Sequence, residues 1–134
     1  MKRLKGFLTI FLSALFISSC ASGGGDNTTA TYRQITMDEA VKMMETEKDY
    51  IILDVHRADE YAEKHIPGAI NVANEDIGED EIPELPDKDQ LILVYCRSGR
   101  RSKEAAEKLV RLGYTNIVEF GGILDWKGET VSEK

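Results

Sequence analysis

Cysteine is scarce in this 134-residue chain, which contains only Cys20 and Cys96. Two cysteines are too few for the disulfide framework that stabilises many small secreted domains. No internal repeat is visible either, which argues against a repeat architecture. About 104 residues follow Ala30, enough for one hydrophobic core and no more. We therefore expect a single small domain without internal cross-links.

Positive charge is also in short supply. The chain carries 17 basic and 24 acidic residues, a net charge of −7, and its first twenty residues hold three of the basic ones and no acid. Without that segment the net charge is −10, from 14 basic and 24 acidic residues. A balance of this kind argues against nucleic acid or an anionic lipid surface as a partner.

The apolar stretch 7–17 is too short for a comfortable membrane span. The basic residues Lys2, Arg3 and Lys5 precede it and small residues follow it, which is typical of a secretory signal. Ile17-Ser18-Ser19-Cys20 resembles a bacterial lipobox, in which the cysteine becomes the lipid-bearing first residue of the mature protein. The alternative is an ordinary signal peptide that contains a cysteine by chance.

Residues 21–31 are rich in Ser, Gly, Thr and Asn, the composition of a flexible tether. The sequence thus predicts a lipoprotein signal peptide over 1–20, a tether over 21–31 and a folded domain over 32–134. The protein is then extracytoplasmic and held at a bacterial membrane only by lipid on Cys20. With Cys20 lipidated, Cys96 is the only thiol and no internal disulfide can form.

Strand-like and helix-like patterns alternate along the domain. Short apolar or β-branched runs predict strands at 32–35, 50–53, 70–72, 91–95 and 117–120. Helices are predicted after a Thr36-Met37-Asp38-Glu39 capping box, over 59–64 and after Ser102, with a helical turn from Ile123. Gly113 is expected to stop the helix after Ser102, and Gly121-Gly122 to end the last strand. The alternation predicts an α/β fold, a parallel sheet flanked by helices on both faces.

Cys96 lies where a buried strand runs into a helix. The apolar run 91–95 precedes it, and three arginines follow within five residues: Arg97, Arg100 and Arg101. The unpaired amides of a helix N-terminus and a curl allowed by Gly99 add to these cations. Together these features favour a thiolate at Cys96. The alternative is a buried structural cysteine, which has no use for three arginines.

Residues 96–101, Cys-Arg-Ser-Gly-Arg-Arg, resemble the active-site loop of single-domain rhodaneses, of the form Cys-x-x-Gly-x-Arg. Two further stretches are similar to signatures of that family: LDVHRADEYAEKHIPGAINV (53–72) and GGILDW (121–126). The resemblance extends over 32–127 and implies a rhodanese-like fold. The chain departs from the family at His56, where an Asp-Val-Arg segment often has its arginine.

The resemblance implies a catalytic Cys96 inside an anion-binding loop. The residues expected to bind the donor are Arg97, Ser98, Gly99, Arg100, Arg101, Ser102, Asp54 and Arg57. Asp54 is expected to orient loop arginines or amides, with capping of its own strand as the alternative. Either Arg57 substitutes for the family arginine or the loop arginines suffice to hold the donor. His56 is open between a contact at the rim of the site and a plain surface residue. His65 is expected to fix the turn that follows it.

The implied activity is that of a thiosulfate sulfurtransferase. The Cys96 thiolate takes the outer sulfur of a donor such as thiosulfate, and a thiol or cyanide then removes it from the Cys96 persulfide. This double displacement needs no metal and no organic cofactor. The implied partners are a small anionic sulfur donor and a thiol acceptor, which can be a protein, and we expect a monomer.

Two other interpretations stay open. Phosphatases and arsenate reductases use the same strand, loop and helix, but their loop is Cys-x5-Arg, and the sixth position after Cys96 is Ser102. Rhodanese-like domains also serve as interaction modules, usually without the cysteine, or as carriers that pass persulfide sulfur to a partner with little turnover. The intact loop favours an active protein over an inactive module, and the sequence does not separate enzyme from carrier.

Overall fold

The structure, a computed structural model, describes residues 31–133. The signal peptide predicted over 1–20, the lipidation predicted at Cys20 and the tether predicted over 21–31 therefore lie outside the described residues, apart from Thr31. None of the helices in the described part has the length and the apolar composition that a membrane crossing needs.

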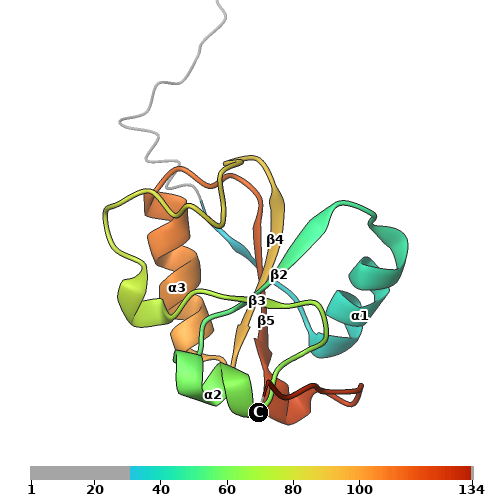
Figure 1. Ribbon diagram of the computed structural model, residues 1–134. Coiled ribbons are helices and arrows are strands. Elements are labelled where there is room, and N and C mark those ends of the chain that lie inside the picture. The colour runs from blue at the N-terminus through green and yellow to red at the C-terminus, as the bar shows by residue number, and fades with distance from the viewer. Residues whose placement is uncertain (1–30, 134) are drawn as a thin grey trace, which may run out of the picture.

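A five-stranded parallel sheet forms the centre of the domain, with the strands in the order β1-β5-β4-β2-β3 (Figure 1). Its strands are β1 (Arg33–Gln34), β2 (Tyr50–Asp54), β3 (Ile70–Asn71), β4 (Leu91–Cys96) and β5 (Ile117–Gly122). Because all strands run the same way, their carboxyl ends meet at one edge of the sheet, where folds of this kind bind ligands. Asp54 and Cys96 both lie at that edge.

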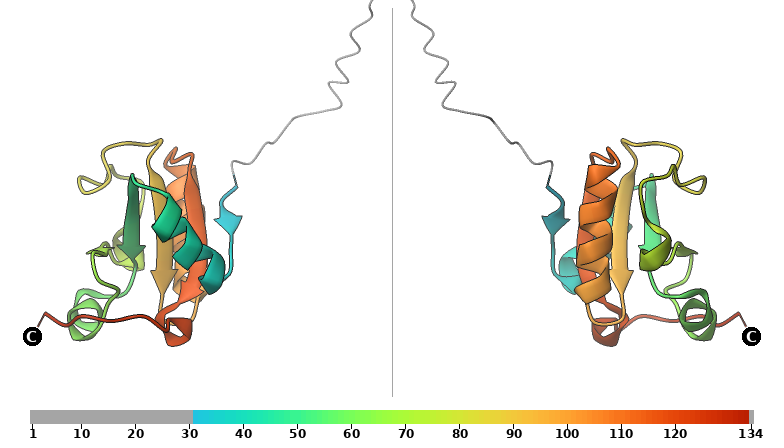
Figure 2. Two further views of the ribbon diagram at one scale, coloured as in Figure 1. Left: turned by 90° about the vertical axis from the view of Figure 1, so that its right-hand side faces the viewer. Right: turned by 90° about the vertical axis from the view of Figure 1, so that its left-hand side faces the viewer.

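Helices cover both faces of the sheet, which confirms the predicted α/β architecture. α3 (Arg100–Arg111) and the short 3₁₀ helix η1 (Asn74–Asp76) lie on one face, and α1 (Met37–Thr46) lies on the other (Figure 1, Figure 2). α2 (Ala58–Glu63) and the 3₁₀ helix η2 (Ile123–Asp125) lie at the carboxyl edge of the strands (Figure 2). This edge is therefore bordered by α2, η2 and the first turn of α3.

The side chains of β4 alternate between the two layers and decide on which face the cysteine lies. Ile92, Val94 and Cys96 pack in the layer that includes α3, while Leu93 and Tyr95 pack in the layer that includes α1. All five are buried because helices cover both faces, and this explains the continuous apolar run. Cys96 thus faces the layer of the helix that follows it.

Helix α3 begins earlier than the apolar pattern indicated. It starts at Arg100, before Ser102, and Gly99 is its N-cap with a φ of 106°. Its end matches the prediction, because Gly113 adopts a φ of 97° and the N–H groups of Gly113 and Tyr114 bond to carbonyls of the last turn. This is a Schellman motif, which requires a residue that tolerates the left-handed conformation.

Gly121 and Gly122 continue the last strand instead of ending it, so the prediction of a break there is wrong. The pairing of β4 with β5 shifts between Val94 and Cys96, which is the mark of a β-bulge in β5. Gly121 accommodates the bulge with a φ of 97°. The strand then passes so close to the cysteine loop that a Cβ on Gly122 would overlap the carbonyl group of Arg97.

Gly122→Ala is therefore expected to displace the cysteine loop and destabilise the domain. The added methyl group meets backbone atoms of Arg97 and Ser98, which cannot move aside as a flexible side chain does. We expect the free energy of unfolding in urea to fall by about 1 to 3 kcal/mol or more. Gly78→Ala is the matched control, because no atom lies within 4 Å of a Cβ there. Equal stabilities of the two variants would contradict this close approach of loop and strand.

Candidate active site

The cysteine loop turns back on its own sulfur atom. Cys96 is 1% exposed, and its Sγ accepts the backbone N–H of Gly99 at 3.0 Å. This contact depends on the left-handed conformation of Gly99, which closes the loop at the start of α3. A helix N-terminus and an amide donor both stabilise negative charge, so the arrangement favours a thiolate.

A buried serine and a buried glutamate lie beside the sulfur. Ser102 Oγ is 3.5 Å from Cys96 Sγ and 2.6 Å from Glu119 Oε1, and the Gly121 N–H also donates to Glu119 Oε1, at 2.8 Å. Ser102 is fully buried and Glu119 is 2% exposed. Sequence reasoning missed Glu119, although an acidic residue inside the apolar strand β5 was a signal that could have found it.

The hydroxyl group of Ser102 has one proton and several acceptors around it. Besides Glu119, the carbonyl oxygens of Gly99 and Gly121 lie 3.0 and 3.3 Å away. The 2.6 Å distance to the Glu119 carboxylate is typical of a charge-assisted hydrogen bond, so the proton points there. Ser102 and Glu119 thus fasten the first turn of α3 to the bulge of β5, directly behind Cys96.

The three loop arginines have different surroundings. Arg101 forms a bidentate pair with Glu60 of α2, with N–O distances of 2.7 and 3.2 Å. Arg100 is exposed and lies 3.8 Å from Glu104 on its own helix. Arg97 is exposed, and within residues 31–133 it has no acidic group at ion-pair distance. Arg97 is therefore the loop arginine that remains available to an anion.

Arg57 lies at the start of α2 instead of at the loop. Its Nε and Nη2 atoms bond to the two carboxylate oxygens of Asp59 at 3.1 and 3.2 Å, and its N–H bonds to Glu60. Hydrogen bonding to Asp59 raises the pKa of Arg57. The predicted replacement of the family arginine by Arg57 receives no support from these contacts, which hold the side chain on its own helix.

Asp54 and His56 form a buried pair at the end of β2. His56 Nδ1 lies 2.7 Å from Asp54 Oδ1, close enough for an ion pair but not aligned as a hydrogen bond, and Asp54 Oδ1 accepts the His56 N–H at 2.8 Å. Asp54 is fully buried and His56 is 3% exposed, so His56 is not a plain surface residue. The contacts of Asp54 are with this histidine rather than with a loop arginine.

His65 has the structural role that was predicted for it. Its ring stacks on Tyr61 with a centroid distance of 3.8 Å, and Nδ1 lies 2.7 Å from the Tyr61 carbonyl oxygen. Its backbone exchanges two hydrogen bonds with Val131. These contacts hold the chain where the turn at 66–69 begins.

A hollow of about 240 Å³ opens beside the cysteine loop. Its lining residues come from the end of β2, from α2, from the loop and from η2: His56, Glu60, Glu63, Lys64, Arg97, Ile123 and Leu124. This is the size of space that suits a small ligand, and Arg97 supplies a cation in it. Among residues 31–133, no three His, Cys, Asp or Glu side chains gather as ligands for a metal.

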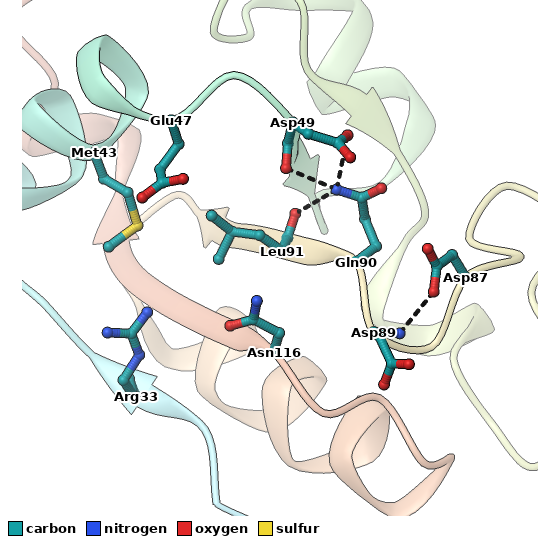
Figure 3. A pocket seen from close by; sticks show the side chains of 9 residues that line it. All are labelled: Arg33, Met43, Glu47, Asp49, Asp87, Asp89, Gln90, Leu91 and Asn116. Carbon is teal, nitrogen blue, oxygen red and sulfur yellow. Dashed lines mark hydrogen bonds between the residues drawn. The ribbon is translucent and has the colours of Figure 1, made fainter.

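A second hollow, of about 300 Å³, lies at the opposite edge of the sheet, where the strands begin (Figure 3). Leu91 is the first residue of β4 and Asp49 directly precedes β2, and both line it. Gln90 Nε2 donates to the Asp49 carbonyl and carboxylate oxygens there (Figure 3). Since the whole length of β4 separates this hollow from Cys96, it is not part of the cysteine site.

Residues 36–129 match the family described as the rhodanese-like domain. The match includes the cysteine loop, the Asp54 segment and the glycines of β5, which are the elements that meet at the carboxyl edge. The chain belongs to the rhodanese-like domain family.

Individual relatives agree with this assignment. The chain is 37% identical over 73 residues to thiosulfate sulfurtransferase PspE of Escherichia coli (strain K12), which covers 54% of this chain and 70% of PspE. It is 34% identical over 97 residues to thiosulfate sulfurtransferase GlpE of Coxiella burnetii, covering 72% of this chain and 88% of GlpE. A solved structure described as a rhodanese with anions from E. coli has a TM-score of 0.57 and 34% identity, covering 62% of this chain and 98% of that chain.

The relatives of this rhodanese-like domain are thus named as sulfurtransferases or sulfur carriers, which supports a sulfurtransferase or sulfur-carrier family for the chain.

The ion pair of Glu60 with Arg101 makes the stability of the domain depend on pH. Hydrogen bonding to Arg101 lowers the pKa of Glu60 from 4.5 to about 2. Because the pKa is lower in the folded state, the pair stabilises the fold above about pH 4.5, and this contribution is lost as the pH falls toward 2. Glu60→Gln is therefore expected to flatten the fall in unfolding free energy across that window, measured by urea denaturation.

The control for this experiment is Glu107→Gln, which changes an exposed residue on α3. The control is expected to keep the pH dependence of the unmodified protein. A Glu60→Gln variant with the same pH dependence as its control would contradict the assigned role of the pair.

Proposed function

We propose that this protein is a sulfurtransferase that moves sulfane sulfur from a small anionic donor such as thiosulfate to a thiol or cyanide acceptor, through a persulfide on Cys96. The observation that carries the proposal is the setting of the Cys96 sulfur, which accepts the Gly99 N–H at 3.0 Å at the start of α3. Both features stabilise a negative sulfur atom. The names of PspE and GlpE, two thiosulfate sulfurtransferases, agree with this chemistry.

In the first half-reaction the Cys96 thiolate attacks the outer sulfur of thiosulfate. A bond forms between Cys96 Sγ and that sulfur, the sulfur–sulfur bond of the donor breaks, and sulfite leaves with the electron pair. Arg97 attracts the anionic donor, because it lies at the hollow without an acidic partner in residues 31–133. Amides of the loop 97–101 stabilise the charge on the new terminal sulfur, as an oxyanion hole stabilises oxygen.

In the second half-reaction an acceptor thiolate attacks the terminal sulfur of the persulfide. The sulfur–sulfur bond of the persulfide breaks, its electrons return to Cys96 Sγ, and the acceptor leaves with the extra sulfur. The two half-reactions share the cysteine but no ternary complex, so the kinetics are of the ping-pong type. No metal and no organic cofactor takes part in this scheme.

The loop does not favour a phosphate ester as the substrate. In a Cys-x5-Arg loop the arginine occupies the position that Ser102 has here, and the Ser102 hydroxyl is buried against Glu119. The position at which such a loop presents a guanidinium group to a phosphate is therefore a buried hydroxyl group here. The geometry therefore supports sulfur transfer over phosphatase or arsenate reductase activity.

We propose that lipid on Cys20 holds the protein at a bacterial membrane outside the cytoplasm, and that the folded domain acts there as a monomer. The acceptor is a small thiol or the cysteine of a protein. A carrier that hands its sulfur to one protein partner uses the same loaded Cys96 and differs only in turnover on small thiols.

The protein is expected to release sulfite from thiosulfate in the presence of a thiol, with parallel double-reciprocal plots for the two substrates. Cys96→Ser is expected to lose this activity by about 1,000-fold or more, because it removes the nucleophile. Lys103→Ala, on the exposed side of α3, is the matched control and should keep the activity. Turnover of aryl phosphates without sulfur transfer would contradict the proposal.

A further inference from the structure

We propose that Glu119 is a positioning residue that keeps the Ser102 proton away from the Cys96 sulfur and thereby slows the release of sulfur from the loaded cysteine. This role rests on the proposed sulfurtransferase function and adds to it a residue that governs the second half-reaction. It starts from a group that the reaction scheme leaves unused, a carboxylate buried two hydrogen bonds away from the nucleophile.

Glu119 points into the layer of the domain that also holds the cysteine. Ile117 of β5 packs with Cys96 in the layer of α3. Val118 and Phe120 pack in the opposite layer, which includes α1. Because side chains alternate along a strand, Glu119 shares the side of Ile117 and meets α3 there.

The Glu119 carboxylate is stabilised by hydrogen bonds rather than by a cation. The Ser102 hydroxyl and the Gly121 N–H both donate to Oε1, at 2.6 and 2.8 Å. Glu119 is 2% exposed, and within residues 31–133 no Lys, Arg or His side chain lies at ion-pair distance from it. A buried charge that depends on so few donors holds them firmly, so the Ser102 proton stays with Glu119.

The Cys96 sulfur therefore faces the lone pairs of Ser102 instead of its proton. A hydroxyl group has one proton, and in the 3.5 Å contact between the two side chains it is the thiol that donates to Ser102 Oγ. The carbonyl oxygens of Gly99 and Gly121 surround the same hydroxyl, at 3.0 and 3.3 Å. A thiolate at Cys96 thus receives the Gly99 N–H at 3.0 Å, but no hydrogen bond from Ser102.

The other charged groups around the sulfur do not replace this donor. Hydrogen bonding to Glu60 raises the pKa of Arg101, and the charge of Cys96 adds to the rise. The guanidinium group of Arg101 is nevertheless held by Glu60, at 2.7 Å. Across the sheet, β1 places the neutral Gln34 opposite Glu119. Glu119 therefore acts on the sulfur through its own charge and through Ser102.

The consequence falls on the second half-reaction. The acceptor thiolate attacks the terminal sulfur of the persulfide, the sulfur–sulfur bond breaks, and its electron pair returns to Cys96 Sγ. Negative charge then arrives on the sulfur atom that faces the Ser102 lone pairs, with the Glu119 carboxylate behind them. Both effects disfavour the departure of the Cys96 thiolate. Ser102 and Glu119 transfer no proton in this step, and they lengthen the life of the persulfide, as a sulfur carrier requires.

The test measures the two half-reactions separately in the purified protein. Thiosulfate loads Cys96, and discharge to a small thiol is then followed by rapid quenching. Glu119→Gln keeps an oxygen for Ser102 and Gly121 but removes the charge, and it is expected to speed discharge on the order of 10-fold. Glu107→Gln, which removes an exposed carboxylate of α3, is the matched control and should keep the unmodified rate. A merely structural role of Glu119 predicts slower discharge, because damage to the site does not increase a rate.

Variants of Ser102 test the route by which Glu119 acts. With Glu119 intact, Ser102→Ala is expected to change discharge by less than about three-fold, because the hydroxyl gives no proton to the sulfur. In the double variant with Glu119→Gln, Ser102→Ala should remove most of the gain, since the freed hydroxyl is the group that stabilises the leaving sulfur. A gain kept in the double variant would overturn the route through Ser102. Ser102→Ala alone, if it slowed discharge on the order of 10-fold, would overturn the proposal even where Glu119→Gln does not fold.

Alkylation of the empty cysteine by iodoacetamide gives a second measurement. Glu119→Gln should react several-fold faster than the unmodified protein near pH 7, because the Cys96 thiolate gains a donor. The two rates should agree within about two-fold near pH 10, where thiols are ionised without help. An equal or lower rate of the variant near pH 7 would contradict the role of Glu119.

Loading separates this role from the function on which it rests. If the unmodified protein loads from thiosulfate and Glu119→Gln discharges no faster than Glu107→Gln, the role of Glu119 is overturned and the function stands. If the unmodified protein does not load, the proposed function itself is overturned.

Discussion

The 2.6 Å hydrogen bond between Ser102 and Glu119 is the contact on which the cysteine site depends. Ser102 belongs to the first turn of α3 and Glu119 to β5, so the bond joins the two elements that follow the reactive sulfur in the chain. Glu119 receives a second donor from Gly121, whose N–H is turned inward at the β-bulge. Because both side chains are buried, loss of either partner removes the hydrogen bond that joins the first turn of α3 to β5 behind the cysteine loop.

Two of the arginines around the cysteine loop and α2 form ion pairs within the fold. Arg101 is held by Glu60 and Arg57 by Asp59, which ties the cysteine loop and α2 to acidic partners. Arg97 remains at the hollow, next to the Asp54–His56 pair. The Arg97 and Lys64 side chains that line the hollow give it cations that suit a small anionic donor, on a chain that is otherwise strongly acidic.

The features that depend on residues close together in the chain could be predicted from the sequence. The apolar run of β4 predicted a strand covered on both faces, Gly113 predicted the end of α3, and the spacing after Cys96 predicted the loop. What depends on pairing between distant segments could not be predicted. Glu119 meets Ser102 across 17 residues of chain, because β5 pairs with β4 and the alternation of β5 turns Glu119 into the layer of α3. The burial of His56 likewise depends on distant segments, because its ring meets Tyr95 of β4 and its carbonyl oxygen accepts from Asn71 of β3.

The central claim is that Cys96 is a nucleophile that carries sulfur, and intact mass spectrometry tests it most directly. After treatment with thiosulfate, the protein should gain the mass of one sulfur atom, and a small thiol should remove it. Cys96→Ser should show no gain under the same conditions. An unmodified protein that gains no sulfur from thiosulfate, polysulfide or mercaptopyruvate would contradict the account.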